Sequence, residues 1–93
     1  MIDKDVLKQY EEGKRDFSNL KLAYANFSGA ALQGCDFSET SLFAARLGEA
    51  DLSDAIFFKT NLTGADLRGT ALKGASFNEA SLTGADFRGG NPK

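Results

Sequence analysis

The sequence predicts an all-β solenoid, a square β-helix of about four coils that follows a short α-helix. Two observations lead to this fold class. A Leu or Phe returns at every fifth position fifteen times without a break, and from residue 25 onward an Ala, Cys or Thr stands two places before each one. We call these Leu and Phe residues the centres, and they are Phe17, Leu22, Phe27, Leu32, Phe37, Leu42, Leu47, Leu52, Phe57, Leu62, Leu67, Leu72, Phe77, Leu82 and Phe87.

Neither regular secondary structure can bury all the centres. Five residues of an α-helix advance about 500°, or about 140° net, so the centres would spiral around every side of a helix. On a straight strand an odd interval would place successive centres on opposite faces. A chain that turns a corner after each pentad can bury all of them. Four right-angle corners then close a square turn of 20 residues.

Residues twenty apart test the square turn, because they should stack in adjacent coils. Three of the four resulting columns are uniform: Phe17, Phe37, Phe57 and Phe77 are all Phe, and the columns that begin at Leu22 and Leu32 are all Leu. A triangular turn of 15 residues would mix Phe and Leu more often. Like side chains stack well where each repeat contacts only its neighbours. Fifteen pentads, at four per coil, make a stack about 18 Å long at a strand spacing of ~4.8 Å.

The residues before the repeats predict a capping helix. In "DKDVLKQYEEG" Asp3 can cap the N-terminus of a helix, and Gly13 stands where a left-handed C-terminal residue belongs. The apolar side chains of this helix, which we expect to cover the first coil, are Val6, Leu7 and Tyr10. We therefore divide the chain into a capping helix (1–14), the β-helix (15–89) and a tail (90–93). In that tail Pro92 takes the position of the next centre, where it cannot donate to a ladder.

The stretches "GADLRGTALKGASF" and "EADLSDA" follow the motif A-(D/N)-L-x-x, and the chain from Phe17 to Gly89 resembles the pentapeptide-repeat family. The segment "YEEGKRDFS" is similar to the opening segment of small cyanobacterial members. The resemblance implies a right-handed quadrilateral β-helix and supports the role of the helix as a cap.

The sequence offers little to a catalytic site. It has no histidine, and its one cysteine, Cys35, stands in an inward position where a buried, unreactive thiol is expected. Acidic residues that precede centres could suggest a metal site, but the motif itself prefers Asp or Asn there, which favours a solvated face; they are Asp36, Asp51, Asp66 and Asp86. We expect no enzyme activity and no catalytic, cofactor-binding or metal-binding residue.

Seven glycines stand two places after a centre, where we expect them to supply the positive φ of a corner rather than a phosphate-binding loop; they are Gly29, Gly34, Gly64, Gly69, Gly74, Gly84 and Gly89.

The overall charge excludes an electrostatic nucleic-acid binder, because the net charge of −2 leaves no basic excess. The first thirty residues mix charges without an apolar run, so we expect neither a secretory signal nor a membrane span, and a cytoplasmic location. A single cysteine cannot form an internal disulfide.

One side of the square differs from the others in its outward residues. The side built on Leu22, Leu42, Leu62 and Leu82 carries no charge apart from Lys21. Loss of charge together with exposed aromatics is typical of the core of a contact surface. We therefore predict a protein-contact site on this side and the adjoining one, formed by Tyr24, Phe43, Ile56 and Phe58.

These features favour a non-enzymatic scaffold or protein-interaction module with an unknown protein partner. The resemblance supplies an alternative, because some pentapeptide-repeat proteins mimic DNA, bind gyrase and confer quinolone resistance. Such mimicry requires a long, strongly negative surface, whereas this stack is short and carries basic residues on most sides. A third possibility is that the chain is one repeat domain of a larger protein.

The C-terminal coil predicts self-association. Only "GGNPK" is available to cover its centres Leu72, Phe77, Leu82 and Phe87, and exposed core is normally covered by a cap, a charge or a partner. We expect a weak end-to-end homodimer about a two-fold axis. Larger members of the family dimerise through a C-terminal helix that this sequence lacks.

Overall fold

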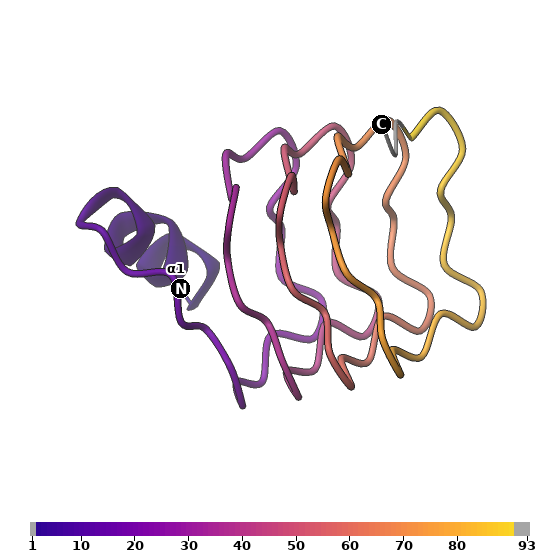
Figure 1. Cartoon of the computed structure of the whole chain (residues 1–93), viewed down its shortest axis with the longest axis horizontal. Helices are drawn as coiled ribbons and strands as arrows, with labels where there is room; N and C mark the ends of the chain where they lie inside the picture. Colours follow the sequence, from indigo (N-terminus) through magenta and orange to yellow (C-terminus); the bar gives the residue numbers. More distant parts are fainter. Residues whose placement is uncertain (1, 91–93) are drawn as a thin grey trace.

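The computed structural model describes residues 2–90, in which one helix is followed by a stack of square coils (Figure 1). The helix α1 spans Ile2–Glu11, and the described chain measures 30 × 23 × 21 Å. Eleven isolated parallel bridges join the coils, and each pairs residues twenty apart, from Asp16 with Asp36 to Asp66 with Asp86. No longer strand forms within residues 2–90. The square turn of 20 residues is therefore confirmed.

Each corner is a tight turn with the φ signs of a type II turn. The N–H of the residue three after a centre donates to that centre's carbonyl, as from Ala25 to Leu22 at 3.1 Å. Inside this turn, the residue two places after the centre has a positive φ, and this holds in all fifteen pentads. Seven of these residues are the predicted glycines. The other eight are not glycine, which the sequence did not indicate, and they are Asn19, Tyr24, Glu39, Ala44, Glu49, Asp54, Lys59 and Glu79.

A regular hydrogen-bond ladder joins successive coils. The N–H groups of a centre and of the residue two after it donate to the next coil, as from Phe57 to Ser76 at 2.8 Å and from Lys59 to Asn78 at 3.0 Å. The N–H of the residue before the centre donates to the previous coil, as from Ser76 to Ala55 at 3.0 Å. Each side of a coil thus donates twice and accepts once toward the C-terminus.

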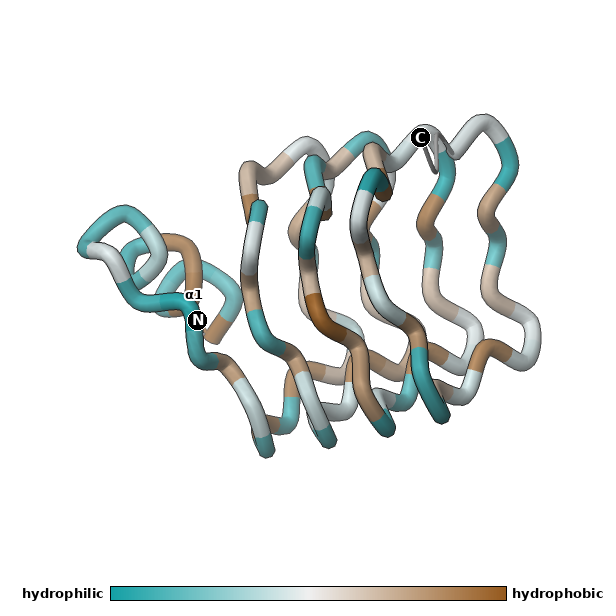
Figure 2. Tube along the Cα trace, in the orientation of Figure 1, coloured by the Kyte–Doolittle hydropathy of each residue, from teal (hydrophilic) through white to brown (hydrophobic). Residues whose placement is uncertain are grey.

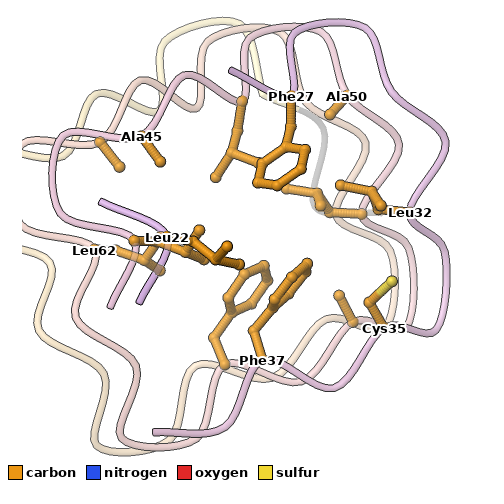
Figure 3. Close-up of a cluster of buried hydrophobic side chains, with 14 of the residues drawn as sticks. Leu22, Phe27, Leu32, Cys35, Phe37, Ala45, Ala50 and Leu62 are labelled. Carbon is orange, nitrogen blue, oxygen red and sulfur yellow. The ribbon is translucent and has the colours of Figure 1, made fainter. Parts of the chain in front are cut away.

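The centres fill the inside of the coils, as Figure 3 shows for several of them. The eleven centres from Phe17 to Leu67 are fully buried. Phe rings stack along one column, with centroids 6.1 Å apart between Phe17 and Phe37, 5.6 Å between Phe37 and Phe57, and 4.9 Å between Phe57 and Phe77. Figure 2 shows hydrophobic residues alternating with hydrophilic ones along the coils, which is how one chain keeps its apolar side chains inside.

The helix α1 covers the first coil, as predicted. Val6 is only 3% exposed and joins the core, while Leu7 and Tyr10 pack against it. The helix ends in a Schellman motif: Gly13, with φ 105°, donates to the carbonyl of Tyr10, and Lys14 donates to that of Gln9.

The prediction that Asp3 caps this helix is wrong. Helix α1 already begins at Ile2, so Asp3 lies within its first turn. Its Oδ2 atom instead accepts the backbone N–H of Asn26 at 3.1 Å, and that hydrogen bond holds α1 against the first coil. This hydrogen bond, with a second from the N–H of Lys4 at 2.9 Å, offsets the cost of burying a carboxylate there. The bond from Asn26 lowers the pKa of Asp3.

The last coil is less well covered than the others. Leu72 is buried, Phe77 and Phe87 are half-buried, and Leu82 is 38% exposed. The rings of Phe77 and Phe87 meet edge to face at 5.7 Å. Residues 91–93 lie outside the described residues, and with them the predicted arrest of the repeat by Pro92.

Candidate protein-contact surface

The predicted uncharged side forms one continuous face along the coil stack. Its bridges place Lys21, Ser41, Asn61 and Ser81 in a single row across the four coils. We call this side the uncharged face; besides that row it comprises Ala23, Tyr24, Phe43, Ala44, Thr63, Gly64, Thr83 and Gly84. Because its backbone is held by the ladder, this face presents its side chains on a fixed frame.

An aromatic pair stands on the uncharged face. Tyr24 is 70% exposed and Phe43 is 38% exposed, and their rings meet edge to face with centroids 5.7 Å apart. Tyr24 occupies a corner with φ 65°, a backbone conformation that bulky residues rarely adopt. The structure therefore brings together two of the four predicted contact residues.

The other two predicted contact residues lie on the adjoining side. Ile56 is 40% exposed and sits in the row between Asp36 and Ser76. Phe58 is half-buried, with the Lys59 ammonium 5.3 Å from its ring centroid. Among the described residues no aromatic pairing links Phe58 with Tyr24 or Phe43. Ile56 and Phe58 therefore lie apart from the aromatic pair, beyond a corner that carries Lys59.

The side built on Phe27, Leu47, Leu67 and Phe87 carries both acidic and basic residues. Asp66 pairs with Arg68 at 2.9 Å, Arg68 approaches Asp86 at 4.0 Å, and Asp86 pairs with Arg88 at 2.7 Å. The hydrogen bonds from Arg68 lower the pKa of Asp66 to about 2. An open groove of about 700 Å³ runs along these ion pairs, beside Arg46. Most charges on this side are paired with one another, so the side carries little net charge.

The carboxylates that precede centres stabilise turns. Asp36 accepts the N–H of Ser38 at 2.9 Å, and Asp51 accepts the N–H of Ser53 at 3.1 Å. Asn61 makes the same hydrogen bond to Thr63 at 3.0 Å. Asp and Asn commonly stabilise turns in this way. No group of three potential metal ligands occurs within residues 2–90. The preference for Asp or Asn thus has a structural cause.

The single thiol is poorly suited to nucleophilic chemistry. Cys35 lies inside the coils, and burial raises the pKa of its thiol to about 12. The thiol is therefore protonated at neutral pH, whereas the thiolate is the nucleophile. Separately, within the described chain no helix has the length and apolar character required to cross a bilayer.

Comparison with known proteins agrees with this geometry. The family model described as "Pentapeptide repeat region" matches residues 14–91, which is most of the chain. The chain belongs to the pentapeptide-repeat family. Its fold is the right-handed quadrilateral β-helix with an N-terminal helix that the sequence predicted. A search of curated proteins found no significant match.

Two solved pentapeptide-repeat proteins from cyanobacteria show the likeness. The protein alr5209 from Nostoc PCC 7120 is 31% identical with a TM-score of 0.59, and the match covers 90% of this chain and 74% of that protein. Rfr23 from Cyanothece 51142 is 28% identical with a TM-score of 0.51, and the match covers 82% and 59%. This pentapeptide-repeat chain thus spans about three quarters of the first and under two thirds of the second.

Proposed function

We propose that this pentapeptide-repeat protein is a non-enzymatic scaffold that binds a protein partner through its uncharged face. The observation that supports this most directly is the exposed Tyr24–Phe43 pair on a side whose only charge is Lys21. Aromatic residues are enriched and charged residues depleted in the cores of protein interfaces. Tyr is also among the residues that most often dominate binding energy.

The remaining chemistry of the chain is consistent with a scaffold. The sequence has no histidine, its thiol is buried, and several of its aspartates hold turns or pair with arginines. The ladder between coils makes the frame rigid, so binding would cost little ordering entropy. We place the protein in the cytoplasm, where a free cysteine stays reduced.

The proposal is tested by charge substitution on the face. Phe43→Lys, alone and together with Tyr24→Lys, should abolish partner capture from a native lysate while leaving far-UV circular dichroism unchanged. Ser53→Lys is the matched control, because Ser53 also follows a centre directly and is partly exposed, but lies on the side opposite the uncharged face. Proteins captured by the wild type and by Ser53→Lys but not by the double variant would be the candidate partners. If the double variant captures the same proteins, the uncharged face is not the contact site.

A further arm tests the adjoining side. Phe58→Lys should weaken capture less than Phe43→Lys, because Phe58 is more buried and already lies against Lys59. Equal losses would instead extend the contact around the corner.

DNA mimicry of the kind that regulates gyrase is the alternative function. A mimic needs a continuous negative surface, whereas on this protein Arg68 and Arg88 neutralise Asp66 and Asp86 along the side built on Phe27. A gyrase supercoiling assay separates the two functions, since a scaffold should leave supercoiling unchanged and a mimic should inhibit it.

A further inference from the structure

The two ends of the coil stack expose different backbone groups. Toward the C-terminus each side presents two N–H groups and one carbonyl to the next coil. On one side, for example, the N–H groups belong to Phe57 and Lys59, and the carbonyl belongs to Ala55. Toward the N-terminus each side presents one N–H and two carbonyls. The C-terminal edge is therefore rich in donors, and the N-terminal edge is rich in acceptors.

The C-terminal edge has unpaired groups on three sides. On the sides built on Phe77, Leu82 and Phe87, six N–H groups and three carbonyls have no hydrogen-bond partner within residues 2–90. The N–H groups belong to Phe77, Glu79, Leu82, Gly84, Phe87 and Gly89, and the carbonyls to Ala75, Ala80 and Ala85. Unpaired strand edges of this kind are templates for pairing with another chain.

Side chains of α1 occupy two backbone groups of the N-terminal edge. Asp3 accepts the N–H of Asn26 at 3.1 Å, and the Tyr10 hydroxyl donates to the carbonyl of Gln33 at 2.8 Å. Val6 covers the first coil from the same helix. Helix α1 lies at the N-terminal end of the stack (Figure 1), where it shields the core and occupies groups that another coil would use.

We propose that the C-terminal edge is a docking surface for the N-terminal edge of a second copy of this chain, which α1 otherwise keeps closed. Stacking in continuous register would pair donors with acceptors as they pair inside the chain. It would also place Phe17 of the second copy over Phe77, and its Leu22 over Leu82. The same Phe-over-Phe contact occurs within the chain between Phe57 and Phe77.

A symmetric contact cannot reproduce this pairing. Two C-terminal edges placed face to face would bring twelve N–H groups against six carbonyls, so half of the donors would lack a partner. A head-to-tail contact pairs unlike edges and does not close, so copies with an open N-terminal edge should add one after another. An end helix that blocks such pairing is a means by which proteins avoid edge-to-edge assembly.

The test displaces α1 from the first coil in the chain of 93 residues. Val6→Asp places a carboxylate at a buried contact and should release the helix. We expect light scattering to show masses at successive multiples of 9.9 kDa that grow with concentration, while the wild type stays no larger than a dimer. If far-UV circular dichroism shows that Val6→Asp does not fold, Asp3→Ala with Tyr10→Phe, which removes the hydrogen bonds from these two side chains to the first coil, decides with the same measurement.

A mixing experiment tests the wild-type edge itself. Val6→Asp with Leu82→Glu has an open N-terminal edge and a blocked C-terminal edge, so alone it should stay monomeric. Mixed with wild type at micromolar concentration it should form a 1:1 complex of twice the monomer mass. Val6→Asp with Thr83→Glu is the matched control, and it should still form the growing series because Thr83 points outward. Monomeric Val6→Asp, assembly that stops at dimers, or assembly indifferent to Leu82→Glu would each overturn the proposal.

Discussion

Single residues define the corners of this protein at some energetic cost. A non-glycine residue in the left-handed region is disfavoured by roughly 1–2 kcal/mol, yet eight of the fifteen corners carry one, including Ala44 and Lys59. Seven of these eight corners still donate their N–H to the next coil, as Ala44 does to Thr63 at 2.8 Å, and the eighth, Glu79, lies in the last coil. The neighbouring coils therefore fix the corner conformation that the residue alone would avoid.

The Asp66–Arg68 pair predicts acid sensitivity. Because the folded pKa of Asp66 lies at about 2, below the ordinary value of 3.8, its ionised form stabilises the fold above pH 3.8. That stability is lost as the pH falls from about 4 to about 2. Asp66→Asn should keep the hydrogen bond that stabilises the turn, because the side-chain amide of Asn61 accepts the same bond from the N–H of Thr63. The melting temperature of Asp66→Asn should therefore fall less steeply over this range than that of the wild type.

Thermal melts at several pH values measure this slope. Glu39→Gln is the control, because Glu39 makes no side-chain hydrogen bond or ion pair within the described residues, and it should keep the wild-type slope. If the melting temperature of Asp66→Asn falls with pH as steeply as that of the wild type, the ion pair does not contribute to the acid sensitivity.

At the scale of elements, the columns of stacked side chains hold the coils together. Phe37 has a ring on either side of it, at 6.1 and 5.6 Å, whereas Phe27 is equally buried but has no aromatic partner among the described residues. Aromatic pairs add about 0.5–1.5 kcal/mol beyond the burial of their area. The uniform Phe column should therefore contribute more than the mixed column per residue.

Replacing each of these residues by Leu separates stacking from burial. Both substitutions remove similar buried area, so Phe37→Leu, which loses two aromatic pairs, should lower the free energy of unfolding by about 1–3 kcal/mol more than Phe27→Leu. Urea denaturation with a shared m-value measures the difference. Equal losses would mean that stacking adds nothing to burial in this column.

At the scale of the whole molecule, the two ends determine how copies meet. The N-terminal end is closed by α1, while Phe77, Leu82 and Phe87 leave apolar surface at the other end. With α1 in place, a two-fold contact between C-terminal ends would rest on these side chains, because the two donor-rich edges pair poorly. Such a contact is small, and small interfaces are weak.

We therefore expect the wild type to form a weak dimer only at high concentration. Phe87→Glu should abolish it, because the substitution places a charge within the apolar end, whereas Thr83→Glu should not. Sedimentation equilibrium up to millimolar concentration measures both. A wild type that stays monomeric throughout this range would refute the end-to-end dimer.

The sequence alone determined the coil. Every coil buries the same kind of side chain at the same interval, so the period of five and the columns twenty apart specified the square turn and placed Tyr24 and Phe43 on one face. Contacts that do not repeat were decided only by the tertiary structure. Asp3 pairs with Asn26 and Tyr10 with Gln33, each 23 residues away, because these bonds depend on how α1 lies across the first coil. No periodicity encodes that placement.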